Sequence, residues 1–469
     1  MVHSRPMPSL RTTCQSCGTA SRPHGSRASI LQVVHRLPTY TPDGSGPMPQ
    51  AVVLLLRVSR SPRLSHRSGL AGNCKDRLAN GKAALVLYTN VGGCHMPGYR
   101  IISSDNHIFE PADLWTTRAE PQFRDRAPRI VREAEGDWWY CDNHRVIGMG
   151  AGAQTGMRFG QSDQLRRTTT FDHVRPGGYL PAEHVKDMDT DGVDVSIVYP
   201  TVGLLLYSVP DSALLTAIFR TYNDWLAEFC HACPDRLKGI ATLNVDDVSS
   251  AVKELERCAK MGLAGGLITV YPPEGRGYNV PAYEPLWAAA EDLEIPLGLH
   301  IATNRPGIGQ EFGAGEKADR VSSAFLANAD HWIRMSLSHM VFSGVFERHP
   351  KLQIGSVEME LSWIPHFLDR IDYTYTQRVQ QDRYRFQEAM LPSDYMHRNV
   401  FYGFQEDGLG IKLRDIIGVD NLLWGSDYPH VESTFPRTQQ ILGEILAECT
   451  EEEKVKIAGG NAARIYHLQ

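Results

Sequence analysis

An acidic residue and a histidine two positions apart form the strongest chemical signal in this sequence. Asp105 and His107 follow the apolar pair Ile101 and Ile102, a pattern that predicts the end of a buried strand opening into a loop. Side chains two positions apart on a strand point to the same side. We therefore expect this carboxylate and this imidazole to bind one divalent cation together.

Three later segments also end a predicted strand with a residue that can bind a metal. They are 297–300, 354–358 and 422–427, and they end in His300, Glu358 and Asp427. Functional groups at the carboxyl ends of several parallel strands are typical of a (β/α)₈ barrel enzyme. Mixed nitrogen and oxygen donors suit Zn or Mn.

The elements that would position these residues follow the same pattern. From residue 100 onward, short β-rich runs alternate with helical patterns, which predicts an α/β fold with parallel strands and crossover helices, a TIM barrel. Helices are expected at 213–230 and at 248–261, the second with Asp246 or Asp247 as its N-cap and Gly262 after its end. The eight expected strands are 100–105, 194–199, 238–243, 265–270, 295–300, 353–358, 399–403 and 422–427.

Two segments are too long to be simple loops. Residues 106–193 include Trp138, Trp139 and the glycine-rich stretch 148–160, so we expect an inserted subdomain, about 115–180, with a hairpin over the barrel mouth. The two tryptophans are expected to pack within this insert. The glycine-rich segment 301–330 is expected to form a mobile loop beside the site.

The first 95 residues differ from the rest in charge. The 469-residue chain has a formal net charge of −6, yet residues 1–95 hold ten Arg and two Lys against two Asp. Their apolar runs are too short to span a bilayer. Because Met96 stands just before the first predicted strand, we interpret 1–95 as a disordered or mis-annotated extension and 96–469 as the barrel domain. A targeting peptide or a nucleic-acid-binding arm is a weaker alternative.

The nine cysteines do not form a framework. Cys14 with Cys17 and Cys230 with Cys233 are separate CxxC pairs, and neither has a second pair at zinc-finger spacing. This pattern favours a reduced, cytoplasmic environment. We expect a small-molecule substrate, with neither nucleic acid nor membrane as a partner.

Several motifs together resemble the amidohydrolase superfamily, in the decarboxylase-like branch with aminocarboxymuconate semialdehyde decarboxylase and the resorcylate decarboxylases. The resemblance covers about residues 99–468. The order and spacing of the motifs support the resemblance more than any single motif does. The motifs are Asp105-Asn-His107 with Glu110-Pro, Lys186-Asp-Met-Asp189, Gly192-Val-Asp194, Phe346-Glu-Arg-His-Pro350, Trp363-Ile-Pro365, Trp424-Gly-Ser-Asp427-Tyr-Pro429-His430 and Gly460-Asn461.

The resemblance implies one divalent ion, Zn or Mn, at the strand ends, with a homodimer as the expected assembly. Its ligands would be Asp105, His107, His300 and Asp427. The sequence departs from the family at the sixth strand, because Glu358 stands where most members have a histidine that acts as acid or base. Glu358 could take over proton transfer or bind the metal itself.

Other polar residues near these motifs have structural alternatives. Glu110 could support a metal ligand from outside the metal site or could only anchor a loop. His430 is expected near the mouth of the site. His339 is expected on an outer helix rather than in the site.

Two reactions suit such a site. In a decarboxylase, or carbon–carbon lyase, the metal orients a substrate carboxylate and Glu358 protonates the carbon that loses carbon dioxide. In a hydrolase, metal-bound water attacks an amide, ester or lactone, with Asp427 or Glu358 as base. We expect decarboxylation of a small aromatic or unsaturated carboxylic acid. A catalytically inactive barrel that binds a small molecule is the alternative from another class.

Overall fold

The computed structural model describes residues 99–468, except residue 274 and the segments 307–322 and 379–383. The expected N-terminal extension lies outside the described residues, as does most of the glycine-rich segment after the fifth barrel strand. Within the described part, no helix is both long enough and apolar enough to cross a membrane.

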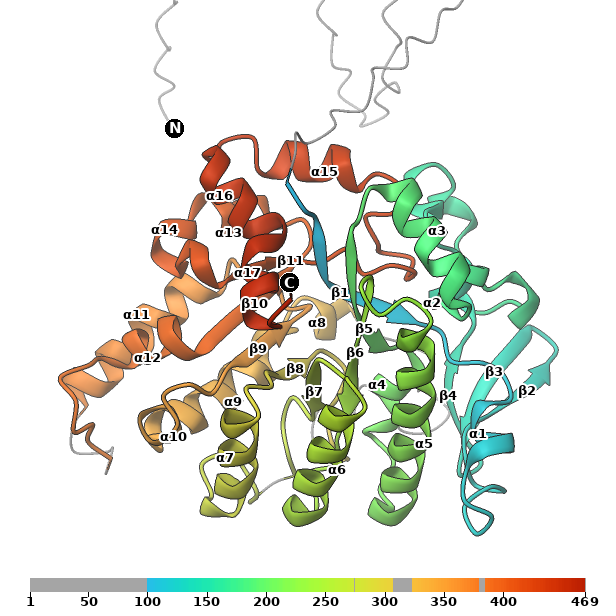
Figure 1. Ribbon diagram of the computed structural model, residues 1–469, viewed down its shortest axis with the longest axis horizontal. Coiled ribbons are helices and arrows are strands. Elements are labelled where there is room, and N and C mark those ends of the chain that lie inside the picture. Colours follow the sequence, from blue (N-terminus) through green and yellow to red (C-terminus); the bar gives the residue numbers. More distant parts are fainter. Residues whose placement is uncertain (1–98, 274, 307–322, 379–383, 469) are drawn as a thin grey trace, which may run out of the picture. The chain divides into compact units, whose positions relative to one another are not determined.

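Eight parallel strands form a nearly closed barrel, as the alternating pattern predicts (Figure 1). Each of the eight expected strands is present. Their order in the sheet follows their order in the chain, which is the topology of a TIM barrel. They are β1 (Ile102–Ile108), β5 (Val195–Pro200), β6 (Leu237–Thr242), β7 (Gly265–Ile268), β8 (Leu297–His300), β9 (Ile354–Val357), β10 (Val400–Phe404) and β11 (Leu422–Trp424).

Helices connect the strands and surround the sheet (Figure 1). The helix expected at 213–230 is α5, and its first turn is capped by Asp211, which accepts hydrogen bonds from the N–H groups of Ala213 and Leu214. The one expected at 248–261 is α6, which Asp247 caps through Ser250. His339 lies on α9, an outer helix, as expected.

The helices after β1 are α1 (Leu114–Arg118), α2 (Gly150–Ala153), α3 (Pro181–Asp191), α4 (Val202–Leu206), α5 (Ser212–His231), α6 (Val248–Lys260), α7 (Glu284–Asp292), α8 (Ser323–Leu326), α9 (Asp330–Phe342), α10 (Val345–Arg348), α11 (Ile364–Gln377), α12 (Pro392–Asn399), α13 (Gly408–Lys412), α14 (Arg414–Ile417), α15 (Thr438–Ile445), α16 (Glu451–Val455) and α17 (Asn461–Ile465).

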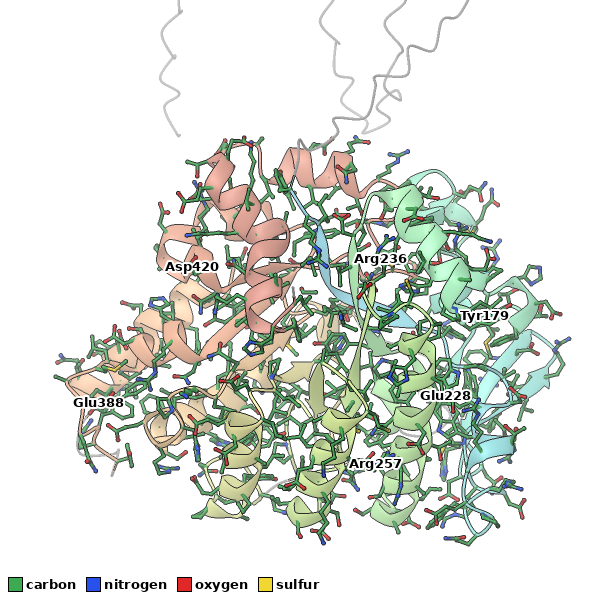
Figure 2. All side chains as sticks on the ribbon, in the orientation of Figure 1. Tyr179, Glu228, Arg236, Arg257, Glu388 and Asp420 are labelled. Carbon is green, nitrogen blue, oxygen red and sulfur yellow. The ribbon has the colours of Figure 1, made fainter. Side chains whose placement is uncertain are left out.

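The outer faces of these helices are polar, while the barrel core is apolar. Glu228 on α5 and Arg257 on α6 are labelled in Figure 2. Glu228 pairs with Arg118 at 2.7 Å, and Arg257 pairs with Glu254 at 2.6 Å. The first pair is exposed and contributes little stability, so burial of the apolar residues between sheet and helices must hold the fold together.

The end of β1 differs from the sequence-based expectation. The strand was expected to stop at residue 105, but it continues to Ile108 because Asn106, His107 and Ile108 still pair with Val198, Tyr199 and Pro200 of β5. The pairing shifts between Ser103 and Asn106, as in a β-bulge. Polar residues here resemble a loop in the sequence, yet they lie in a strand that borders the site.

The barrel closes between β1 and the segment after β11. Asp427 N–H donates to the carbonyl of Asp105 at 2.8 Å, and His107 N–H donates to the carbonyl of Tyr428 at 2.6 Å. The strand expected at 422–427 ends earlier, at Trp424. Gly425 follows it, and a Cβ there would lie 2.6 Å from the Cβ of Asp105, so only glycine allows this close approach.

A separate three-stranded antiparallel sheet lies in the segment that was expected to be an insert. It consists of β2 (Arg129–Glu133), β3 (Gly136–Cys141) and β4 (His144–Gly148) (Figure 1). Trp138 and Trp139 are buried in this sheet, and Trp139 meets Trp115 edge-on with ring centroids 5.5 Å apart. Both tryptophans therefore serve packing, as the sequence suggested.

Candidate metal and substrate site

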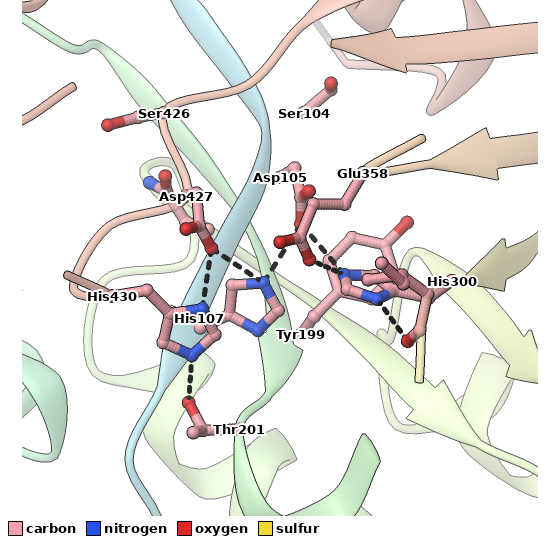
Figure 3. Close-up of polar contacts among 12 residues, drawn as sticks. Ser104, Asp105, His107, Tyr199, Thr201, His300, Glu358, Ser426, Asp427 and His430 are labelled. Carbon is pink, nitrogen blue, oxygen red and sulfur yellow. Dashed lines mark hydrogen bonds and ion pairs between the residues drawn. The ribbon is translucent and has the colours of Figure 1, made fainter. Parts of the chain in front are cut away.

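Four predicted side chains meet at the carboxyl ends of the barrel strands (Figure 3). Each of them brings one buried polar atom that has no hydrogen-bond partner. These atoms are Asp105 Oδ1, His107 Nε2, His300 Nε2 and Asp427 Oδ1, the last of which also lies in ion-pair distance of His430, 2.7 Å from its Nδ1. Buried polar atoms are normally paired, because leaving one unpaired costs about 1–3 kcal/mol. Four such atoms in one place are the arrangement expected of ligands to a cation.

The spacing of these atoms suits a small divalent ion. His107 Nε2 lies 3.3 Å from Oδ1 of both Asp105 and Asp427, and His300 Nε2 lies 3.4 Å from Asp105 Oδ1. Ligands about 2.0–2.2 Å from a tetrahedral Zn ion would be about 3.3–3.6 Å apart. Asp105, His107 and His300 therefore fit one ion as they stand, whereas Asp427 Oδ1 groups with His107 and His430 instead.

Two geometric groups share His107. Ligand atoms of Asp105, His107, His300 and Glu358 lie within 4.8 Å of one another, and those of His107, Asp427 and His430 form the second group. The structure thus brings all the predicted site residues except Glu110 to this centre. Asp427 lies on the side of His107 opposite the larger group, while Glu358 lies 3.5 Å from His300.

Backbone carbonyls hold both histidines in the form that a metal requires. His107 Nδ1 lies 2.8 Å from the carbonyl oxygen of Pro200, and His300 Nδ1 lies 3.0 Å from that of Ile301. Since a carbonyl only accepts, we assign the proton to Nδ1 in both rings. Nε2 then presents its lone pair to the site, as in histidine ligands fixed by an outer hydrogen bond.

Glu358 differs from the four buried groups in its exposure. Its side chain is 22% exposed, compared with 3% for Asp105 and 1% for Asp427. It lines a cavity of about 230 Å³ together with Asp427, His430, Thr201 and Glu432. Apolar residues form the rest of the wall, among them Ile147, Ala151, Leu204, Leu205, Ile301, Leu326 and Val431.

The pKa values of the three carboxyl groups differ in direction. Burial alone would raise the pKa of Asp105, but in the metal-free site, where the histidines can also carry a proton on Nε2, attraction to His300 and hydrogen bonds with both rings lower it below its ordinary value. Burial and repulsion by Asp427 and Asp105 raise the pKa of Glu358 well above its ordinary value. Burial raises the pKa of Asp427 to about 7. Asp105 is therefore ionised, whereas the environment of Glu358 favours its protonated form.

His430 belongs to the site more closely than the sequence suggested. Its Nδ1 lies 2.7 Å from Asp427 Oδ1 and its Nε2 lies 2.9 Å from Thr201 Oγ1 (Figure 3). Its ring stacks on that of His107, with centroids 4.1 Å apart. Burial lowers the pKa of His430 to about 4, which keeps the ring neutral.

Glu110 is a loop anchor rather than a neighbour of the centre. Its carboxylate accepts hydrogen bonds from the N–H groups of Val202 and Gly203, both at 2.9 Å. These bonds fix the start of α4, directly after Pro200 and Thr201, which are the partners of His107 and His430. Burial raises the pKa of Glu110 to about 7.

Two site residues have strained backbones. Glu358 and Asp427 have φ angles of 57° and 59°, in the left-handed region that side chains other than glycine rarely adopt. Such conformations cost about 1–3 kcal/mol each and persist where the surroundings enforce them, often at functional sites. No sequence signal marks this strain, and none marked Thr201 as the partner of His430.

The sequence matches a known family over most of its length. The family model described as "Amidohydrolase" matches residues 141–468. Among curated proteins, γ-resorcylate decarboxylase of Rhizobium sp. (strain MTP-10005) is 28% identical over 299 residues, which cover 61% of this chain and 86% of that protein. The relatives therefore include decarboxylases.

Solved structures share the fold. An amidohydrolase from Mycobacterium avium subsp. paratuberculosis K-10 superposes with a TM-score of 0.64 at 22% identity, over 79% of this chain and 98% of the other. A dihydroxybenzoic acid decarboxylase from Polaromonas sp. JS666, with bound manganese and an inhibitor, gives 0.53 at 19% identity, over 79% and 98%. With the barrel and the strand-end donors described above, the family match shows that this chain belongs to the amidohydrolase family.

Proposed function

We propose that this protein is a metal-dependent decarboxylase that acts on a small aromatic or unsaturated carboxylic acid. The observation that carries the proposal is a buried set of metal-binding donor atoms beside Glu358, which lines a small, largely apolar cavity. Decarboxylases among its relatives, and the manganese in one structural neighbour, support the same reading.

Asp105, His107 and His300 would hold the ion, and Asp427, 3.3 Å from His107 Nε2, is the further ligand expected from the sequence, which would have to approach the other two. A bound divalent ion supplies Lewis-acid attraction for the carboxylate and an adjacent oxygen of the substrate. No Lys or Arg is among the described residues that line the cavity. Among the described residues, the donor set is therefore the place that would bind a substrate carboxylate.

Glu358 would act as the general acid. Its carboxyl group lines the cavity, and its raised pKa favours the protonated form that a general acid needs. It would transfer this proton to the carbon that bears the carboxylate. The carbon–carbon bond then breaks, carbon dioxide leaves, and the electron pair of that bond stays with the substrate carbon. Glu358 regains a proton from solvent before the next turnover.

The cavity suggests a small substrate. Its volume of about 230 Å³ is below the roughly 300–1,000 Å³ of most ligand pockets. Apolar walls formed by Leu204, Leu205 and Ile301 can pack against a ring or an unsaturated chain and exclude water from the reacting carbon.

Hydrolysis is the second candidate. It is favoured by the 2.7 Å contact between His430 and Asp427, a pair that could accept a proton from water. Protein loaded with Mn or Zn would be incubated with hydroxybenzoic acids and with ester and lactone substrates. Release of carbon dioxide that is lost in Glu358→Gln supports decarboxylation. Turnover of esters or lactones alone would replace it with hydrolysis, and binding without turnover would favour an inactive barrel.

A further inference from the structure

The segment between β11 and α15 carries two groups of the site but belongs to no strand. It begins after Trp424 and includes Asp427 and His430. Asp427 holds its left-handed backbone there, a conformation that surrounding contacts must enforce. The hydrogen bond from Asp427 N–H to Asp105 restrains it on the barrel side.

Helix α3 restrains the same segment from the other side, through Asp187. Tyr428 Oη donates a hydrogen bond to Asp187 Oδ2. Arg175 donates to the same carboxylate from Nε at 2.7 Å and from Nη2 at 2.5 Å. Asp187 is 9% exposed and lies in the motif that starts at Lys186, for which the proposed reaction has no use.

Close packing leaves Tyr428 a single position. A Cβ on Gly177 would overlap both Tyr428 Oη and Asp187 Oδ2, so a glycine is needed behind their contact. The ring of His184, also on α3, meets the ring of Tyr428 edge-on at 5.1 Å. His184 is itself held by Gly177 O at 2.9 Å and Ser196 Oγ at 3.1 Å.

A second carboxylate on α3 holds the far end of the segment. Asp191 accepts hydrogen bonds from the N–H of Thr438 at 3.1 Å and from its Oγ1 at 2.6 Å. Asp187 and Asp191 are four residues apart, so they lie on one face of the helix. Figure 1 shows the red segment after β11 beside α3.

We propose that Asp187 is a positioning residue for the site. It holds Tyr428, and through Tyr428 it keeps Asp427 and His430 opposite Asp105, His107 and His300. This inference rests on the proposed function only in assigning metal binding to Asp427. Asp187 is neither one of the candidate donor residues nor part of the cavity lining, so it acts through its partners: directly on Tyr428, and through Arg175, whose guanidinium lies 4.8 Å from the ring centroid of Phe435 in the same segment.

The test compares Asp187→Asn with Asp189→Asn in the full-length protein. Asp189 is on the same helix but pairs at the surface with Arg236 at 2.8 Å, which makes it a matched control. Mn²⁺ affinity would be measured by titration without substrate, together with the melting temperature. We expect Asp187→Asn to bind Mn²⁺ roughly 10- to 100-fold more weakly, as removal of outer-sphere support does, and Asp189→Asn to bind like wild type.

A double variant tests the route. If Asp187 acts through Tyr428, then Asp187→Asn with Tyr428→Phe should bind Mn²⁺ no more weakly than the weaker single variant. Additive losses would overturn the proposed route. Unchanged Mn²⁺ affinity in a folded Asp187→Asn protein would overturn the positioning role.

Amide hydrogen exchange separates this inference from the proposed reaction. In metal-free protein, Asp187→Asn should speed exchange at residues 426–431, and Asp189→Asn should not. If wild type binds no metal, the proposed function fails while the exchange result alone decides the positioning role. Equal exchange in both variants would refute positioning, whatever the reaction proves to be.

Discussion

The main-chain N–H of Asp427 donates a 2.8 Å hydrogen bond to the carbonyl oxygen of Asp105, so the bond that closes the barrel also joins two candidate metal ligands. The side chains of both residues then reach His107 Nε2 at the same distance of 3.3 Å. The same main-chain hydrogen bond therefore closes the barrel and positions two candidate ligands.

Removal of either histidine ligand should release the ion. In His107→Ala or His300→Ala, one of the four unpaired donor atoms is gone, and we expect metal affinity to fall more than the roughly 10- to 100-fold seen for outer-sphere partners. Elemental analysis after dialysis measures retention, and circular dichroism checks the fold. Wild-type metal content in a folded variant would show that these histidines are not ligands.

Glu358→Gln should separate metal binding from proton transfer. Glutamine has a similar shape but no acidic proton, so kcat should fall about 10²- to 10⁴-fold while the metal content stays constant. The neighbouring Glu360→Gln serves as the control and should retain the ion with a far smaller loss of rate. Loss of metal from Glu358→Gln would instead identify Glu358 as a ligand.

Glu110 should make stability depend on pH. Burial raises its pKa from an ordinary value of 4.5 to about 7, so between these values the native protein keeps a proton that the unfolded chain loses. Its contribution is complete below pH 4.5 and is lost as the pH rises through 7, by about 3 kcal/mol. Urea unfolding at pH 5, 6 and 7 without metal measures this loss.

The matched variant for that experiment is Glu110→Gln, which stays neutral throughout. The difference in unfolding free energy between wild type and variant should shrink or reverse as the pH rises from 5 to 7. Parallel pH profiles for the two proteins would mean that Glu110 ionises at its ordinary pH despite its burial.

A larger side chain at Ala151 should impair substrate binding alone. Ala151 lines the cavity, so Ala151→Phe should fill part of it and raise KM about tenfold or more, with metal content unchanged. Ala153→Phe on the same short helix, away from the cavity lining, is the control. Equal KM values in both variants would place the substrate elsewhere.

Much of this architecture could be predicted from sequence because strand periodicity is local. The apolar runs before His300 and Glu358 located their strands to within a few residues, and Asp105 and His107 were correctly assigned to one face. The continuation of β1 to Ile108 was not predictable, because polar residues there look like a loop until β5 pairs with them.

Tertiary contacts determined the rest. The turn held by Glu110, the contact of Thr201 with His430, and the left-handed backbones at Glu358 and Asp427 all depend on segments far apart in the chain. The motif that starts at Lys186 includes Asp187, but only the hydrogen bond from Tyr428 in the structure suggests a role for this residue.

The cavity wall has two origins. Ile147 and Ala151 come from the segment between β1 and α3, whereas each candidate donor atom comes from a barrel strand or the residues directly after one. One part of the wall thus comes from a stretch that supplies no donor atom, while Leu204, Leu205 and Ile301 come from segments that follow barrel strands. Substitutions in the segment between β1 and α3 could therefore change substrate selectivity without altering any candidate donor residue.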